Sequence, residues 1–308
     1  MKKRKNECLL TQHSILFELN ADCVGHIGHF LGGITWDICT IWSCVSKQFQ
    51  QLAWTYWQKT LSVPIHFVDS NAASSRWAEK YGKVVESAEF RSEQSAMRLD
   101  FPNLKSVLLQ FDATKVHRVP SLSRFANLQT VHLYDITNGS LDDINLPNLQ
   151  ELILTRCDLI VRNVPRKSFP HLLKVTLYVD NRNHFANLDF ILHLPCLEDL
   201  TLGMNYVPSL LRIYICELRH LTSLTLICYN VDEIMTNLDF LTSLTRLRHL
   251  ELRGFTRLTD ITALTKLISL RTVRICNSPR LREIDSLLLL KKTLYVVINS
   301  TVLHTLSV

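Results

Sequence analysis

The sequence is poor in residues and patterns that mark several common classes of protein. It has 8 glycines and 9 prolines in 308 residues and no low-complexity stretch, which excludes a collagen-like or largely disordered chain. No apolar run reaches the roughly 18 to 20 residues that a membrane-spanning helix needs, so we expect no membrane partner. Hydrophobic residues make up 47% of the chain and charged residues 20%, which indicates a folded protein with a large core.

The chain also lacks the short motifs around which active sites are commonly built. It has no Gly-x-Ser-x-Gly, His-Glu-x-x-His, phosphate-binding loop or Gly-x-Gly-x-x-Gly pattern. Its 12 histidines are scattered, and His26 and His29, with Cys23 nearby, fit residues of a helix face better than metal ligands. We therefore expect no catalytic site, no metal and no cofactor, and an enzyme is the weakest of the functions considered.

None of the nine cysteines stands in a Cys-x-x-Cys pair, the spacing typical of zinc sites. Their odd number and the large expected core argue against a disulfide framework and favour reduced thiols that pack as small apolar groups. This predicts a protein of the cytoplasm or nucleus. The net charge of +6 is modest, and no basic stripe is interleaved with aromatic residues, so nucleic-acid binding is not expected.

From residue 101 to the end, the sequence contains a repeat. Leu149 to Leu159 is a full match to Leu-x-x-Leu-x-Leu-x-x-Asn/Cys-x-Leu. Before each unit the apolar residues stand three positions apart, a spacing typical of a tight helical turn. Within the unit the last apolar residues stand two positions apart, which is typical of a strand. The first leucines of the units, here called the anchors, recur every 21 to 26 residues: Leu104, Leu128, Leu149, Leu172, Leu197, Leu221, Leu247, Leu270 and, as a ninth candidate, Leu294.

Residues 101–308 thus resemble an array of eight or nine leucine-rich repeats. The resemblance implies an α/β solenoid, a horseshoe whose concave face is a parallel sheet that binds proteins or peptides. Most units depart from the family's Asn/Cys position, so irregular turns are expected where Asp112, Ile136, Asp180, Tyr229, Phe255 and Ser278 stand.

Strand alternation predicts which side chains this concave face offers to a target protein. Residues two, four and six positions after each anchor should point away from the core. The candidates for partner binding are Leu108, His132, Tyr134, Ile153, Tyr178, Glu251, Arg253 and Arg274, with Phe111 just beyond its strand. Aromatic and arginine side chains are typical of interface hot spots, although strands favour β-branched and aromatic residues in any case.

Residues 14–62 do not follow the repeat and have the apolar spacing of helices. They resemble an F-box: Leu19, Asp22, Ile27 and Leu31 lie in the register of its opening, and the run from Val45 to Ala53 is similar to its closing segment. Asn20 stands where the family usually has Pro, and Asp22 where it has Glu. The resemblance implies a small all-helical domain that binds a Skp-type adaptor through Leu19, Asp22, Ile27, Leu31, Ile38, Ile41, Val45 and Phe49. The alternative is a helical cap that shields the first repeat.

Two further segments complete the expected organisation. Residues 1–13 form a basic tail that we expect to be disordered, with nuclear import or an acidic partner as alternative roles. Residues 63–100 form a junction in which Val84 to Phe90 fits an extra, imperfect first repeat.

An F-box followed by leucine-rich repeats is an order found in substrate receptors of ubiquitin ligases. The resemblance therefore implies the substrate-recognition subunit of a Skp-cullin-F-box ligase, with a Skp-type adaptor, a cullin complex and an unknown target protein as partners. The alternative is a non-enzymatic leucine-rich repeat scaffold or regulator with no link to ubiquitin.

Overall fold

The computed structural model describes residues 65–67, 78–79, 82–91, 96, 98, 100–110, 119, 121–140, 145–160, 169–179, 189–205, 207–230, 235–281, 295–298 and 301–303. The basic tail, the F-box-like segment and all its expected adaptor-binding residues lie outside these residues. The chain divides into two compact units, Met1–Val107 and Leu108–Val308.

The first unit contains strands in the segment that the sequence assigned to a junction. β1 (Ile65–Phe67) pairs in parallel with β2 (Ser87–Phe90), which follows the 3-10 helix η1 (Gly82–Val84). The rings of Phe90 and Phe101 are both buried, with centroids 5.9 Å apart. A Cβ at residue 82 would lie 2.6 Å from the carbonyl oxygen of Asp100, so only glycine fits that close approach. β3 (Ser106–Gln110) lies across the division between the units.

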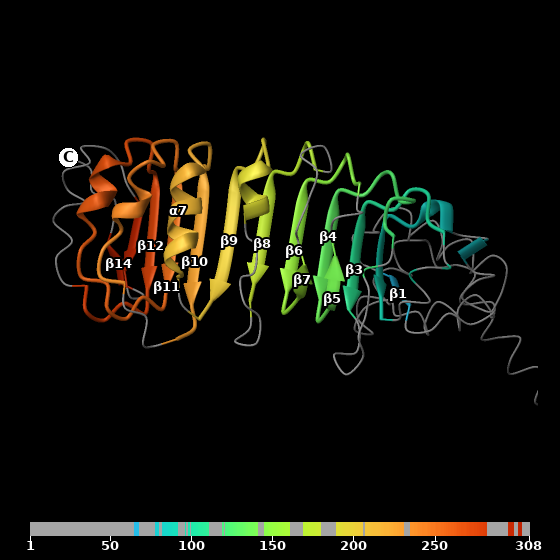
Figure 1. The fold of residues 1–308 in the computed structure, drawn as a ribbon, viewed down its shortest axis with the longest axis horizontal. Coiled ribbons are helices and arrows are strands. Elements are labelled where there is room, and N and C mark those ends of the chain that lie inside the picture. Colours follow the sequence, from blue (N-terminus) through green and yellow to red (C-terminus); the bar gives the residue numbers. More distant parts are fainter. Residues whose placement is uncertain are drawn as a thin grey trace, which may run out of the picture. The chain divides into compact units, whose positions relative to one another are not determined.

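The second unit is built on a sheet of short strands in which neighbours along the chain are neighbours in space (Figure 1). In this sheet the strands β4, β6, β8, β9, β10, β11, β12 and β13 follow one another, and each pairs in parallel with the next, which confirms the predicted parallel sheet. Every strand of this sheet from β4 to β12 begins two residues after its anchor. The strands are β4 (Thr130–Tyr134), β6 (Glu151–Thr155), β8 (Lys174–Tyr178), β9 (Asp199–Met204), β10 (Ser223–Cys228), β11 (His249–Arg253), β12 (Thr272–Cys276) and β13 (Tyr295–Ile298).

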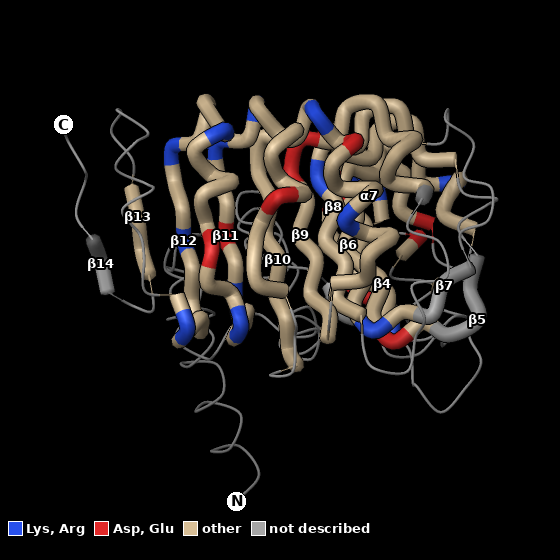
Figure 2. Tube along the Cα trace, turned by 60° about the vertical axis from the view of Figure 1, so that its left-hand side comes forward, with Lys and Arg blue, Asp and Glu red and all other residues tan. Residues whose placement is uncertain are grey.

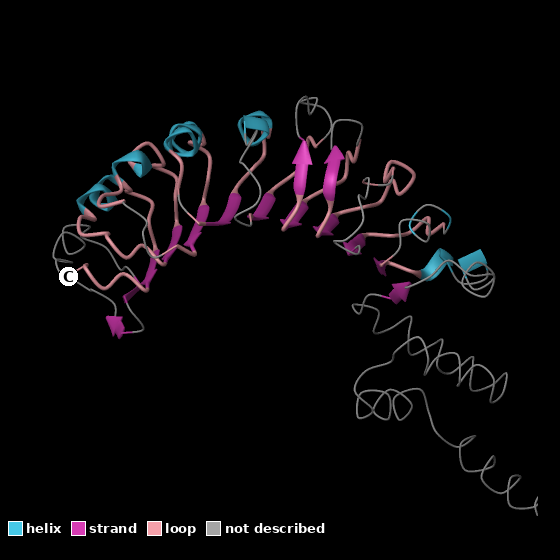
Figure 3. Ribbon diagram, turned by 60° about the horizontal axis from the view of Figure 1, so that its bottom comes forward, coloured by secondary structure: helices cyan, strands magenta, loops and turns pink. Residues whose placement is uncertain are grey.

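Tight turns return the chain from one strand to the next, as the spacing of three predicts. The backbone N–H of Phe125 donates to Leu122 and that of Leu128 to Phe125, and Leu264, Leu267 and Leu270 repeat the pattern. The back of the unit carries η2 (Asp189–His193), α7 (Ser209–Glu217), η3 (Asp239–Leu241) and η4 (Thr262–Lys266). Figure 3 shows the strands on the inner side of this curved unit and these helices on its outer side.

The core lies between the sheet and this back. Each of the eight anchors from Leu104 to Leu270 is at most 1% exposed, and the strand residues three and five positions after each anchor are buried too. No single repeat could cover these leucines, so stacking the repeats is what removes them from water.

The sequence prediction was wrong at the C-terminal end of the array in two respects. Thr272 pairs with Tyr295, so the ninth anchor position is residue 293 and not Leu294. The assigned register would have put Val296 on the open face, but Val296 is 0% exposed and Tyr295 takes that place. The array is also not purely parallel, because β14 (Thr301–Leu303) pairs antiparallel with β13. A returning strand of this kind covers the hydrogen-bonding edge that the last repeat leaves open.

A second, small sheet was not predicted either. β5 (Thr137–Ser140) and β7 (Asp158–Ile160) pair in parallel outside the main sheet, directly after the turns that follow β4 and β6.

Candidate functional site

The strand register stacks the residues that point to the concave face into rows that cross the sheet. One row runs through His132, Ile153, Thr176, Thr201, Thr225, Glu251, Arg274 and Val297, and the row beside it through Tyr134, Thr155, Tyr178, Gly203, Ile227, Arg253 and Cys276. Seven of the nine residues expected to bind a partner therefore lie in these two rows. Leu108 lies half-buried on β3, and Phe111 lies outside the described residues.

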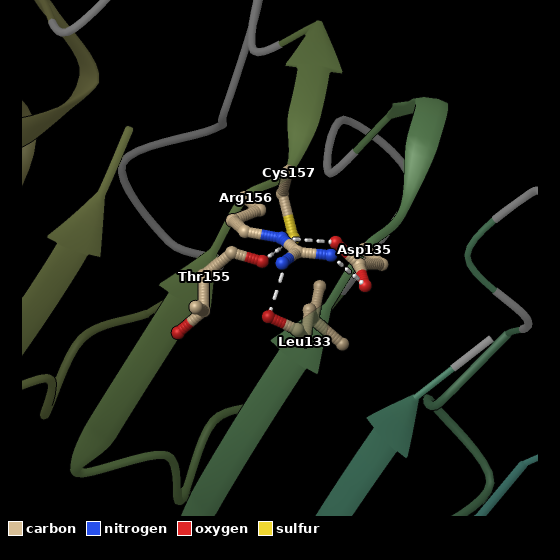
Figure 4. A network of polar contacts seen from close by, with 5 residues as sticks. All are labelled: Leu133, Asp135, Thr155, Arg156 and Cys157. Carbon is tan, nitrogen blue, oxygen red and sulfur yellow. Dashed lines mark hydrogen bonds and ion pairs between the residues drawn. The ribbon is translucent and has the colours of Figure 1, made fainter. Parts of the chain in front are cut away.

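Arg156 contacts both Asp135 and Tyr134 at the early end of this face. Its Nε and Nη2 donate to Oδ1 and Oδ2 of Asp135 at 2.6 and 2.5 Å (Figure 4). Its guanidinium carbon lies 5.0 Å from the ring centroid of Tyr134. Asp135 is 12% exposed and Arg156 48% exposed. A two-pronged ion pair of this kind holds a side chain in one orientation more firmly than a single contact does. The ring of Tyr134 is therefore presented in a fixed position.

The backbone positions this ion pair. Asp135 and Arg156 have φ values of 56° and 52°, in the left-handed region of backbone conformation that residues other than glycine seldom adopt. Each follows a five-residue strand directly, as do Gly254 and Asn277, which are also left-handed. The N–H of Asp135 donates to the Thr155 carbonyl and that of Arg156 to the Tyr178 carbonyl, so each turn is tied to the next repeat.

Cys157 stands at the Asn/Cys position of its repeat, and its side chain forms hydrogen bonds with the backbone there. Its thiol lies 3.2 Å from the carbonyl oxygen of Leu133 and 3.4 Å from that of Thr155, and donates to them (Figure 4). Burial raises the pKa of this thiol to about 11, so it is neutral at neutral pH. A neutral, buried thiol is a structural hydrogen-bond donor and not a nucleophile.

Gly203 makes room for two tyrosines. It lies directly across from Tyr178, and a Cβ there would be 2.5 Å from Cδ1 of Tyr178 and 2.6 Å from the hydroxyl of Tyr229. Tyr229 directly follows β10 and is 54% exposed. Partial burial is the main cause that raises the pKa of its hydroxyl, and the nearby Tyr178 raises it further. The sequence pattern treated Tyr229 only as a departure from the Asn position. The structure adds it, with Asp135 and Arg156, to the concave face.

Charged side chains fill the centre of the sheet. Lys174 Nζ lies 2.9 Å from Glu151 Oε1, and this hydrogen bond is the largest factor that raises the lysine pKa. Burial raises the pKa of Asp199 on the next strand, against the opposing influence of Lys174 and a hydrogen bond from Ser223. Further along, Glu251 accepts from Arg253 Nε at 2.5 Å and lies 3.5 Å from Arg274 Nε. The early repeats thus combine tyrosines with the Glu151 to Lys174 ion pair, and the later ones carry the Glu251, Arg253 and Arg274 group.

His132 should make the stability of the array depend on pH. It is half-buried, with Nε2 3.1 Å from Thr155 Oγ1 and its ring edge-on to Tyr134, and burial lowers its pKa from 6.5 while Glu151 opposes the shift. Because the unfolded chain then takes up this proton first, the free energy of unfolding should fall as pH drops below 6.5, until the lower folded pKa is passed. The slope from this histidine fades within about one pH unit above 6.5, where both states have lost the proton.

We expect His132→Gln to flatten that part of the stability profile, measured by urea unfolding between about pH 5 and 7.5. His171→Gln changes an exposed histidine just before the anchor Leu172, two repeats further on, and should leave the profile unchanged. Identical profiles for the His132 variant and the unmodified chain would show that this group does not couple folding to pH.

Within the described residues, no helix has the length and apolar content to cross a membrane, and no group of three or more His, Cys, Asp and Glu is placed to hold a metal ion.

Comparison with known proteins gives structural likenesses only. No family model and no curated protein matches the chain. Among solved structures, internalin C2 of Listeria monocytogenes matches 49% of the chain at 22% identity with a TM-score of 0.35, and the chain covers 62% of it. InlP of the same organism matches 63% at 19% identity and a TM-score of 0.43, with 56% of it covered. A leucine-rich repeat protein of Leptospira interrogans matches 76% at 17% identity and 0.42, with 70% covered. The chain thus spans less than two thirds of the first two, and these likenesses say nothing of what it binds.

Proposed function

We propose that this chain is a leucine-rich repeat protein that binds a partner protein through its concave face. The observation that carries the proposal is that three tyrosines, Tyr134, Tyr178 and Tyr229, lie on this face, the last two close together at Gly203. One ring is fixed by the Arg156 to Asp135 ion pair, and two lie against the backbone at Gly203. Aromatic side chains that are already ordered lose little conformational entropy when a partner covers them.

The finer proposal is that the chain is the substrate-recognition subunit of a Skp-cullin-F-box type ubiquitin ligase in the cytoplasm or nucleus. It rests on the F-box-like register of Leu19, Ile27 and Leu31 ahead of the repeats. In this role the N-terminal segment binds the adaptor and the array holds the target, while other subunits transfer ubiquitin. The alternative is a leucine-rich repeat scaffold that binds the target and recruits no ligase.

Tyr134→Ala combined with Tyr178→Ala should reduce the affinity for the target by roughly a hundredfold, since each aromatic hot spot contributes on the order of 1 to 2 kcal/mol. The measurement is quantitative mass spectrometry of proteins that copurify with each variant, followed by titration of the recovered target. Leu210→Ala with Ile213→Ala is the matched control, because these side chains are 64% and 56% exposed on α7 at the outer side of the unit. Equal recovery with both double variants would contradict binding at the concave face.

A further inference from the structure

Basic residues are concentrated in the last repeats of the described sheet. In residues 235–281 there are eight Lys and Arg against three Asp and Glu, and all eight basic side chains are exposed. Figure 2 shows Lys and Arg at both ends of β11 and β12. Like charges placed this densely raise the local potential and attract acidic partners. The basic residues are Arg246, Arg248, Arg253, Arg257, Lys266, Arg271, Arg274 and Arg280.

The concave face is hollowed at the same place. An open hollow of about 530 Å³ lies over β10 to β13, and its lining includes Thr225, His249, Glu251, Thr272, Arg274 and Tyr295. A hollow of this volume accommodates a few side chains of an extended peptide. Tyr295 is 48% exposed at one end of it.

Glu251 carries the one carboxylate among the residues that line this hollow. It lies between two guanidinium groups, at 2.5 Å from Arg253 Nε and 3.5 Å from Arg274 Nε. A guanidinium has five N–H donors, so one carboxylate shared between two of them leaves most donors able to take further acceptors. Arg253, Arg274 and Glu251 together have one net positive charge, and the two guanidinium groups can accept a second carboxylate.

We propose that this hollow binds an acidic, extended segment of the partner protein, with a side-chain carboxylate of that segment held by Arg274, which lines the hollow, and by Arg253, which lies beside it on Glu251. The proposal rests on the proposed function, because it assigns a chemistry to part of the same concave face. An acidic peptide fits better than a nucleic acid. A polyanion that continued along the face would meet Asp199 on β9 and Glu151 on β6, whereas a short acidic segment ends before them.

The test uses the full chain and fluorescein-labelled ten-residue peptides in which Ser alternates with either Glu or Gln, together with a ten-nucleotide single-stranded DNA. Fluorescence anisotropy at low salt should show the Glu peptide binding at least tenfold more tightly than the Gln peptide and more tightly than the DNA. Arg253→Glu with Arg274→Glu should weaken binding of the Glu peptide at least tenfold. Arg257→Glu with Lys266→Glu makes the same change in net charge outside the hollow and should weaken it less than threefold.

Glu251→Gln should change the affinity for the Glu peptide in the opposite direction. It removes the carboxylate that competes for the two arginines, so binding of the Glu peptide should tighten about threefold. Asp260→Asn removes an exposed carboxylate outside the hollow and should have no such effect. The proposal is overturned if the DNA binds more tightly than the Glu peptide, if both reversal pairs weaken binding equally, or if Glu251→Gln does not tighten it. Loss of the target in the Tyr134 and Tyr178 variant would still support the proposed function in that case, so the two failures are distinguishable.

Discussion

Leu200→Asp should unfold the array or lower its free energy of unfolding by roughly 3 to 5 kcal/mol, while Thr201→Asp should lower it by less than about 1 kcal/mol. The two residues are neighbours on β9, but Leu200 is 0% exposed and Thr201 faces the concave side. In the register, Leu200 lies between Val175 and Leu224, so a carboxylate there is surrounded by apolar groups and has no partner. A carboxylate at residue 201 stays in contact with water.

Urea unfolding followed by circular dichroism gives both free energies under one set of conditions. Leu152→Asp repeats the test on β6, where Leu152 is 2% exposed and lies across from Val175. Similar losses for Leu200→Asp and Thr201→Asp would mean that the register is displaced by one residue, because such a shift exchanges the two faces of a strand.

Leu19→Asp combined with Ile27→Asp should abolish copurification of a Skp-type adaptor. The segment of residues 14–62 offers more apolar side chains than so short a module hides in itself, and an exposed apolar patch marks an interaction site. Two carboxylates in a buried interface cost several kcal/mol, which is a loss of a thousandfold or more in affinity. The repeat array has its own core, so its melting temperature and its binding of the target should not change.

Gln12→Asp with His13→Asp adds the same charge ahead of the F-box-like register and should leave adaptor recovery unchanged. If the unmodified chain recovers no adaptor even at high expression, the ligase proposal fails and the scaffold alternative takes its place.

The strand register of the array could be predicted from the sequence because each repeat contains the same apolar pattern. A leucine anchor followed by alternating apolar residues can bury its side chains in only one frame, and the same frame recurs from Leu104 to Leu270. The rows of the concave face then follow from alternation alone, which is why His132, Tyr134, Ile153 and Tyr178 were assigned to that face correctly.

The predicted register was wrong at β13, where the apolar pattern of the anchor is ambiguous. Residues 287–290 are four leucines in succession and Leu294 follows, so more than one frame satisfies the apolar pattern. Val296, Val297 and Ile298 are consecutive apolar residues, and they also do not separate the two faces of β13.

Contacts between repeats could not be predicted for a different reason. The pairing of Asp135 with Arg156 depends on left-handed backbone at two positions 21 residues apart, and only the stacked structure brings them together. The proximity of Tyr229 to Tyr178 likewise depends on the missing side chain of Gly203, which lies on the strand between theirs.

The most direct measurement of where the partner binds is site-specific photocrosslinking in cells. Benzoylphenylalanine in place of Tyr178 reports on the concave face, and in place of Ile213, 56% exposed on α7, it reports on the outer side. We predict a crosslink from residue 178 to the same target that the Tyr134 and Tyr178 alanine variant fails to recover, and none from residue 213. A crosslink to that target from residue 213 alone would contradict binding through the concave face.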